Sequence, residues 1–185
     1  VFTTKYTRLG TKGMIISRCF DDKIGAFIVA EILRHLKKEP IKAAIYGVAT
    51  VQEEIGTRGA IISAYSVDPQ IGIAYDVTFA TDSPDMVESD IGIVTLGGGP
   101  SITRGPNINP VLFYLLVQTA RDLQIPLQFR AAAGPTGTDA RSMQITRSGV
   151  ATALIGIPNR YMHSANEVVH LDDVADDAAD ESQQE

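Results

Sequence analysis

The chain has 185 residues, of which 44% are hydrophobic and 21% are charged, and its formal net charge is −6 at pH 7. This length and composition are typical of one globular domain. No apolar run approaches the roughly 20 residues that a membrane-spanning helix needs, and no signal peptide opens the sequence, so we expect no membrane partner.

The negative charge is unevenly distributed. Seven of the 22 acidic residues lie between Asp172 and Glu185, and the other 15 nearly balance the 16 Lys and Arg residues. The body therefore carries no basic field, which argues against nucleic-acid binding, and we expect residues 175–185 to form a solvated acidic tail. Cys19 is the only cysteine, so we expect a small buried side chain and a reducing, cytoplasmic location.

Short apolar runs alternate with amphipathic stretches along the chain. The first half predicts a strand at 14–16, a helix from 22 to about 38 with Asp21 as its N-cap, a β-rich stretch at 41–51, a helix at 58–65 and a strand at 71–75 ending at Asp76. The second half predicts strands at 91–96, 127–133 and 150–157, and helices at about 110–123 and 139–146. This alternation is typical of a layered α/β domain with helices on both faces of its sheet.

Four groups of candidate ligands each follow a predicted strand. They are Asp21, the pair Glu53 and Glu54, Asp76, and His163. In open α/β sheets, sites gather outside the carboxyl ends of the strands. Several carboxylates with one imidazole would suit Zn²⁺, Co²⁺ or Mn²⁺, and so many carboxylates would repel one another around a single ion.

Each of these residues also has an ordinary structural interpretation. Asp21 could only cap its helix, Asp76 could be a turn residue, and His163 could be a polar loop residue. The adjacent Glu53 and Glu54 after an apolar run are the hardest to explain by structure alone. Taken together, the four positions favour a metal site.

The motifs resemble one family closely. Phe20-Asp21-Asp22-Lys23-Ile24-Gly25, Val51-Gln52-Glu53-Glu54-Ile55-Gly56-Thr57-Arg58-Gly59-Ala60 and Tyr75-Asp76-Val77-Thr78 are similar to signature segments of the tetrahedral aminopeptidases, which include glutamyl and deblocking aminopeptidases. Further similar segments are Thr81-Asp82-Ser83-Pro84, Leu96-Gly97-Gly98-Gly99-Pro100, Gly137-Thr138-Asp139-Ala140 and Gly156-Ile157-Pro158-Asn159-Arg160-Tyr161-Met162-His163-Ser164. The resemblance runs in order from about Gly13 to Val174. It implies a three-layer α/β/α sandwich with a mixed central sheet of the zinc-exopeptidase type.

The resemblance also implies roles for individual residues. Asp21 matches a carboxylate that bridges two divalent ions, most often Zn or Co, with Mn as an alternative. Glu54 and His163 match ligands of one ion, and Asp76 matches a ligand of the other. Glu53 matches the general base of a metal-dependent aminopeptidase that removes N-terminal residues from short peptides.

Four further residues are expected to support the site or contact substrate. Asp22 would support the ligands or the start of the helix, and Asp139 would cap a helix that lines the site. Arg160 and Tyr161 would contact the substrate or lie buried under the loop that carries His163. The family is also expected to form homo-oligomers.

One expected ligand is missing from the sequence. The resemblance implies a histidine, in a His-x-Asp segment, upstream of the bridging aspartate, whereas the three histidines here are His35, His163 and His170. We therefore expect residues 1–18 to be the end of an inserted β-rich dimerisation domain with its return segment, and residues 19–174 to be the catalytic domain. A shortened chain and a natural short paralogue both remain open at this point.

Two alternatives to an aminopeptidase follow from the same residues. A related metal hydrolase acting as a carboxypeptidase or on N-acyl substrates would use the same centre. A non-catalytic fragment or subunit that lacks one ligand would bind a partner instead. The segment from Gln52 to Ala60 favours the aminopeptidase.

Overall fold

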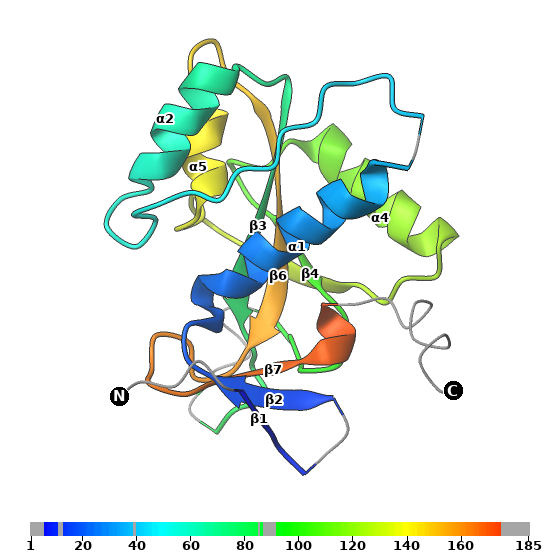
Figure 1. The fold of residues 1–185 in the computed structure, drawn as a ribbon, viewed down its shortest axis with the longest axis vertical. Helices are drawn as coiled ribbons and strands as arrows, with labels where there is room; N and C mark the ends of the chain where they lie inside the picture. The colour runs from blue at the N-terminus through cyan, green and yellow to red at the C-terminus, as the bar shows by residue number, and fades with distance from the viewer. Residues whose placement is uncertain (1–5, 11–12, 39, 85, 87–91, 175–185) are drawn as a thin grey trace.

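Two sheets and four helices form the part of the chain that the structure describes, which comprises residues 6–10, 13–38, 40–84, 86 and 92–174 of a computed structural model (Figure 1). The strands are β1 (Thr7–Arg8), β2 (Met14–Ser17), β3 (Ile71–Phe79), β4 (Ser101–Arg104), β5 (Gln128–Ala131), β6 (Ala151–Asn159) and β7 (Glu167–His170). The helices are α1 (Phe20–Leu36), α2 (Arg58–Val67), α4 (Pro110–Asp122) and α5 (Asp139–Gln144), and a 3₁₀ turn, η1, covers Leu171–Asp173.

The larger sheet has the strand order β3-β6-β4-β5 and is mixed. Strands β3 and β6 run parallel over their whole length, from the pair Ile71–Ala151 to the pair Phe79–Asn159. Strand β4 is antiparallel to β6 and parallel to β5. The smaller sheet, β1-β2-β7, is antiparallel and lies beside the start of α1 (Figure 1). The predicted mixed central sheet is therefore confirmed.

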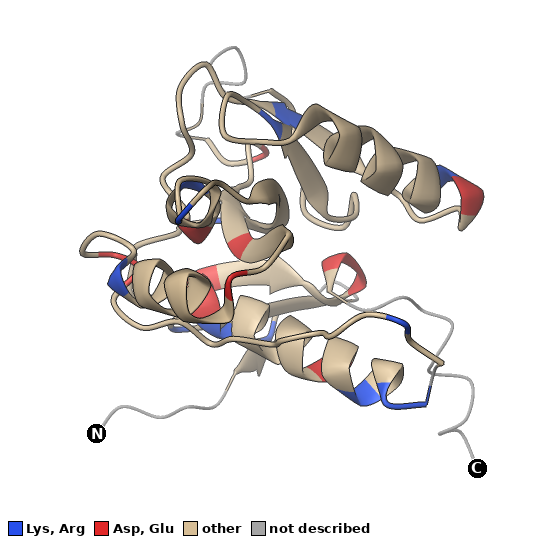
Figure 2. Cartoon of the chain, turned by 90° about the horizontal axis from the view of Figure 1, so that it is seen from above, with Lys and Arg blue, Asp and Glu red and all other residues tan. Residues whose placement is uncertain are grey.

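Helices cover both faces of the larger sheet. Leu154 of β6 packs in one apolar cluster with Phe113 of α4 and Ala140 of α5. Ile157 of β6 packs in a second cluster with Ile24 of α1. Because side chains alternate along a strand, positions three residues apart point to opposite faces. Helices α1 and α4 accordingly lie on opposite sides of the molecule in Figure 2, which confirms the predicted layers.

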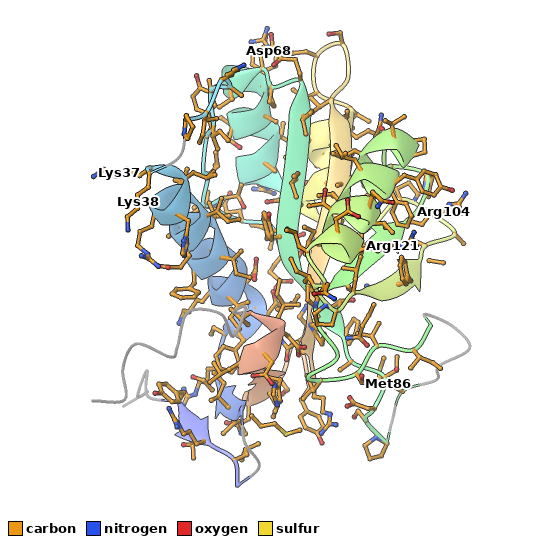
Figure 3. The ribbon with its side chains drawn as sticks, turned by 90° about the vertical axis from the view of Figure 1, so that its right-hand side faces the viewer. Lys37, Lys38, Asp68, Met86, Arg104 and Arg121 are labelled. Atoms are coloured by element: carbon orange, nitrogen blue, oxygen red, sulfur yellow. The ribbon has the colours of Figure 1, made fainter. Side chains whose placement is uncertain are left out.

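Helix α1 includes Phe20, but Asp21 and Asp22 have non-helical dihedral angles, so its regular part starts close to the predicted residue 22, and Asp21 does not cap it. Cys19 holds the N-cap position with φ 56° and makes no side-chain capping hydrogen bond. The capping contact comes from Asp22, whose Oδ1 accepts the Gly25 N–H at 2.8 Å. At the other end Lys37 and Lys38 follow the last turn and lie at the far end of α1 (Figure 3).

The β-rich stretch at 41–51 forms no strand, contrary to the prediction. No strand of the described part of the chain pairs with it. Large apolar side chains stay exposed there, as at Tyr46 and Val51, each 66% exposed. A β-strand is defined by its hydrogen bonds to a neighbouring strand, so a high β propensity alone does not produce one.

Several other predicted boundaries were wrong. Asp76 lies inside β3 rather than beyond its end, because the pairing with β6 continues to Phe79. Pro158 lies inside β6. The pairing of β6 with β4 has already ended at Gly156, so no hydrogen bond to β4 needs the N–H that proline lacks. Residues 92–95 form no strand, and residue 91 lies outside the described residues.

The prediction that the Cys19 side chain is buried was wrong. Cys19 is exposed, and it occupies the left-handed turn before α1.

A side chain of the protein itself binds backbone N–H groups of the glycine-rich segment before β4. Asp173, buried in η1, accepts the N–H of Gly97 at 2.9 Å and the N–H of Gly99 at 2.8 Å. Strands β4 and β7 were not predicted, and β7 leads directly into this contact. The start of the acidic region is therefore part of the fold, while residues 175–185 lie outside the described residues.

Candidate metal centre

Three of the predicted ligands converge at one end of α1. Each of Asp21, Glu54 and His163 offers a ligand atom, and these three atoms lie within 4.8 Å of one another. The His163 Nε2 atom is 3.1 Å from Asp21 Oδ2 and 3.6 Å from Glu54 Oε2. Two carboxylates and one imidazole at this spacing suit a divalent ion such as Zn²⁺ or Co²⁺.

Unusual backbone conformations border the three ligands. Of the eight described non-glycine residues with a left-handed φ, five lie in the segments that carry the ligands. These five are Cys19, Gln52, Thr57, Tyr161 and His163. Such conformations cost free energy and cluster where a side chain must be held in a particular direction.

A tight turn presents Glu53 and Glu54 together. The Glu53 carbonyl accepts the N–H groups of Gly56 and Thr57 at 2.9 and 2.8 Å, immediately before α2 begins. Gly56 has φ 114°, which favours glycine at this point of the turn. Glu54 reaches the side chain of His163, whereas the charge of Glu53 acts on Asp76.

Asp76 lies beside this trio rather than in it. Its ligand atoms are outside the set that Asp21, Glu54 and His163 form, but the charges of Asp22, Glu53 and Asp21 act on it. Its own Oδ1 accepts the N–H of Val77 at 2.8 Å. Position 76 thus extends the acidic centre into the second half of β3.

The carboxylates of the centre hold their protons more tightly than free side chains do. Desolvation, followed by the charge of Glu54, raises the pKa of Asp21 to about 6. Desolvation and the charge of Asp139 raise the pKa of Glu53 to about 7. Desolvation and the charge of Asp22 raise the pKa of Asp76 to about 8. Neighbouring negative charges without a cation have this effect, and a bound divalent ion would relieve it.

Asp22 and Asp139 lie beside the centre at the starts of two helices. Asp22 caps α1, and desolvation is the first cause that raises its pKa to about 6. Asp139 is the first residue of α5 rather than its N-cap, which is Thr138, so its predicted capping role was wrong. Its Oδ2 accepts the hydrogen bond of the Thr50 hydroxyl at 2.6 Å, and its buried Oδ1 has no hydrogen-bond partner among the described residues.

Arg160 is bound to a carboxylate of the protein. Its Nε and Nη2 donate to Asp82 at 2.9 and 2.6 Å, which ties the loop after β6 to residues 81–82. Tyr161 is 50% exposed, with φ 61°. Arg160 is therefore placed to hold the loop that carries His163.

The other two histidines lie elsewhere. His35 is exposed on α1, and its Nε2 atom lies 4.0 Å from Glu31 Oε2. The His170 Nδ1 accepts the N–H of Asp172 at the start of η1. Neither belongs to the group of ligand atoms around Asp21.

Glu167, which is buried on β7, is not among the predicted site residues. Its Oε2 accepts the N–H of Asp21 at 3.0 Å. The sequence gives only a weak signal for Glu167. It is a single glutamate four residues after His163 and is followed by two valines, which is typical of an ordinary strand residue. Only the fold brings it to Asp21, 146 positions earlier in the chain.

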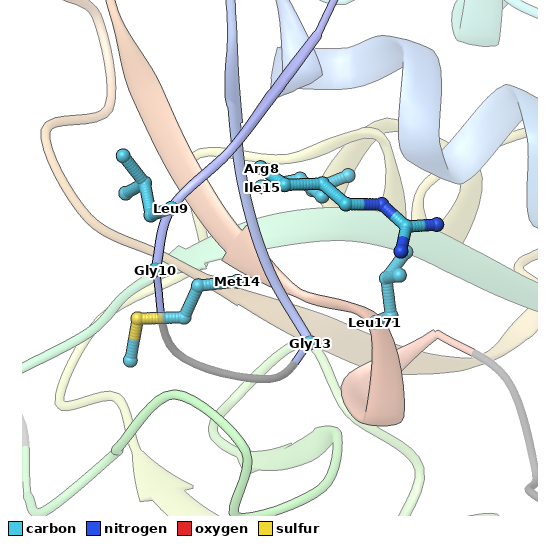
Figure 4. A pocket seen from close by; sticks show the side chains of 7 residues that line it. All are labelled: Arg8, Leu9, Gly10, Gly13, Met14, Ile15 and Leu171. Atoms are coloured by element: carbon cyan, nitrogen blue, oxygen red, sulfur yellow. The ribbon is translucent and has the colours of Figure 1, made fainter.

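One hollow lies away from this centre. It is lined by residues of the β1–β2 hairpin and by Leu171, and it contains none of the candidate ligands (Figure 4). Among the described residues, no helix has both the length and the apolar character to cross a membrane. The Lys and Arg residues drawn in Figure 2 are dispersed over several elements.

The sequence matches the family of M42 glutamyl aminopeptidases over residues 1–179. The chain belongs to this family. It is 44% identical to the lysyl aminopeptidase of Pyrococcus furiosus over 173 residues, which are 94% of this chain and 48% of that relative.

Two solved structures agree with the sequence match. An aminopeptidase of the archaeon Desulfurococcus kamchatkensis is 39% identical, with a TM-score of 0.83 over 94% of this chain and 49% of that one. A peptidase of Pyrococcus horikoshii that can assemble into a tetrahedron or a large octahedral shell is 28% identical, with a TM-score of 0.78 over 94% and 50%. The chain thus spans about half the length of the relatives that it matches, and its fold is of the type predicted.

Proposed function

We propose that the protein is a metal-dependent aminopeptidase that hydrolyses N-terminal residues from short peptides. The observation that carries the proposal is the convergence of Asp21, Glu54 and His163 within 4.8 Å. The names of the relatives and the family of the chain support the choice of an aminopeptidase over other metal hydrolases.

The donor set accommodates divalent metal, with Zn²⁺ or Co²⁺ preferred and Mn²⁺ as an alternative. Glu54 and His163 would hold one ion, Asp76 a second, and Asp21 would be shared between them. Bound divalent ions polarise a scissile carbonyl and acidify the attacking water. The centre fits this chemistry because its carboxylates are crowded and incompletely neutralised by the described residues.

Glu53 is proposed as the general base. Its side chain is half-buried beside Glu54, and burial raises its pKa to about 7. A base with a pKa near the working pH accepts a proton readily and also returns it. Glu53 would take the proton of the attacking water and pass it to the leaving amine. Bound cations would lower its pKa, so the carboxylate form would predominate in the loaded protein.

A homo-oligomer in the cytoplasm is proposed as the working form. The assembly of the Pyrococcus horikoshii relative supports oligomerisation. The single cysteine in the sequence favours a reducing compartment.

Two neighbouring substitutions test the proposal in the full-length protein. Glu53→Gln keeps the size of the side chain but removes the basic oxygen, so we expect turnover to fall by about 10²–10⁴-fold with metal content unchanged. Glu54→Gln should lower both metal content and turnover, because an amide is a poorer ligand than a carboxylate. Metal analysis and hydrolysis of an aminoacyl substrate measure the two effects.

Glu31→Gln is the matched control, because Glu31 is an exposed carboxylate on α1. Glu31→Gln should change neither the metal content nor the turnover. If Glu53→Gln removed the metal and Glu54→Gln retained it, the two roles would be reversed. If neither substitution affected turnover, the proposed enzyme activity would be wrong.

A further inference from the structure

A buried carboxylate on β7 holds the backbone of the shared ligand. Glu167 is 3% exposed and faces Ser17, the last residue of β2, across the small sheet. The chain passes from Ser17 through a left-handed turn at Cys19 to Asp21, whose N–H donates to Glu167 Oε2 at 3.0 Å. Figure 1 shows β7 and β2 beside the beginning of α1.

The amide of Asp21 needs a partner from outside its own helix. Asp21 and Asp22 have non-helical dihedral angles, φ −82°, ψ 105° and φ −123°, ψ 62°. The amides at the start of a helix have no partner within the helix, and no side chain at the N-cap supplies one here. Glu167 satisfies the amide at Asp21, so it fixes the direction in which the Asp21 carboxylate leaves the backbone.

The same loop contacts Asp21 twice. His163 lies 3.1 Å from the Asp21 carboxylate, and Glu167, four residues later, binds the Asp21 amide. Between Arg160 and Val168 two backbone hydrogen bonds, of 2.9 and 3.1 Å, close this loop at its base. Glu167 is adjacent to that closure, so its contact sets the separation between Asp21 and His163.

The charge of Glu167 is not required for this hydrogen bond. A glutamine at the same position would accept the Asp21 N–H without placing a buried negative charge near Asp21 and Asp22. Burying a charge is costly unless it is compensated. A cation bound by Asp21 would supply that compensation.

We propose that Glu167 is a positioning residue that orients Asp21 toward His163 for metal binding and adds negative charge behind the bound ion. The inference rests on the proposed metal centre. Residues that hold a ligand from behind typically contribute 10–100-fold to metal affinity.

Two substitutions separate the reach of Glu167 from its charge. Glu167→Asp keeps the charge but withdraws the carboxylate by one methylene from the Asp21 amide. We expect a shifted visible absorption band of bound Co²⁺ and an affinity lower by about 10–100-fold. Glu167→Gln keeps the reach, so we expect an unshifted band and an affinity loss of less than about tenfold. Calorimetric titration with Co²⁺ measures the affinity.

Asp173→Asn is the matched control. Asp173 is also buried and also accepts backbone N–H groups, those of Gly97 and Gly99, but it is not part of the candidate centre. Its substitution should lower the melting temperature without altering the Co²⁺ spectrum. A change of spectrum caused only by loss of folding stability would appear in this variant as well, and that result would overturn the proposal.

The outcomes distinguish the two proposals. A wild-type protein that binds no Co²⁺ would overturn the metal centre and the role of Glu167 together. A wild-type protein that binds Co²⁺, with a folded Glu167→Asp variant of the same spectrum and affinity, would overturn only the role of Glu167. A Glu167→Gln variant as impaired as Glu167→Asp would also overturn the positioning role.

Discussion

Carboxylates with raised pKa values make the centre sensitive to pH when no metal is bound. Asp76 is the strongest case, since its pKa rises from 3.8 to about 8 through desolvation and neighbouring charge. In the unfolded chain the same group ionises near 3.8. Between these two values the folded state binds more protons than the unfolded state, so its stability falls as the pH rises.

We therefore expect the metal-free protein to melt at a lower temperature at pH 8 than at pH 5. Asp76→Asn removes one such group and should reduce this pH dependence. Thermal unfolding followed by circular dichroism in a chelator, from pH 5 to pH 8.5, measures the effect. A melting temperature that rose over this range in the wild-type protein would contradict the raised pKa values.

The two proposed metal positions should differ in affinity in this chain. One has an imidazole and two carboxylates within 4.8 Å. Among the described residues, Asp76 belongs to no such group that includes a histidine. Titration of the 185-residue chain with Zn²⁺ should show one tighter and one weaker event. His163→Ala should weaken the tighter event, with His35→Ala as the control on an exposed helix face. Two equally tight events would argue against the assignment.

At the scale of elements, α1 is held against β3 at Gly25. A Cβ atom there would lie 2.2 Å from Asp22 Oδ2 and 2.8 Å from the Tyr75 carbonyl. Alanine is normally favoured over glycine in a helix by about 1 kcal/mol. The close backbone contact should reverse this, because overpacking costs about 1–3 kcal/mol.

We accordingly expect Gly25→Ala to destabilise the protein and to weaken metal binding by displacing Asp22. Urea unfolding and metal titration measure the two effects. Gly134→Ala is the control, since beyond its chain neighbours no atom of the described residues lies within 4 Å of the added Cβ. Equal stability of both variants would show that α1 can move away from β3 at little cost.

Local patterns predicted the long elements better than the short ones. The apolar spacing and stop signals of α1, α2 and α4 placed them within a few residues. Strands β4 and β7, of four residues each, carry too few side chains to show a pattern. The stretch 41–51 had the composition of a strand, but whether it pairs depends on a neighbour that composition does not reveal.

The site was predicted where the chemistry is concentrated in a motif and missed where it depends on long-range contact. Asp21, Glu54 and His163 stood out through their types and order, and the structure brings them together. Glu167 and Asp82 act through partners 146 and 78 positions away. Nothing in the local sequence of either residue indicates its partner.

At the scale of the whole molecule, one edge of the larger sheet is unpaired within the described part of the chain. Strand β3 is at the end of its sheet, and no described strand pairs with its outer edge. Residues 41–51 also carry exposed apolar side chains, among them Tyr46 and Val51. Free edges and apolar patches favour association.

We expect the isolated chain to self-associate as its concentration rises. Replacing the exposed Tyr46 and Val51 by lysine should reduce the association, because added charge opposes both pairing and apolar contact. Light scattering against concentration measures it, and replacing the exposed Val111 of α4 by lysine is the control. Equal scattering by both variants would exclude the stretch 41–51 as the contact.

The contact between Asp173 and the glycine-rich segment has a consequence for the timing of folding in the cell. Asp173 binds amides 74 and 76 positions earlier in the chain, just as Glu167 binds an amide 146 positions earlier. A ribosome synthesises these acceptors after the donors that they bind. The N–H groups of Gly97, Gly99 and Asp21 therefore stay hydrogen-bonded to water until residues 167–173 have left the ribosome. Metal captured earlier during translation would meet Asp21 before the proposed contact with Glu167 holds it in place.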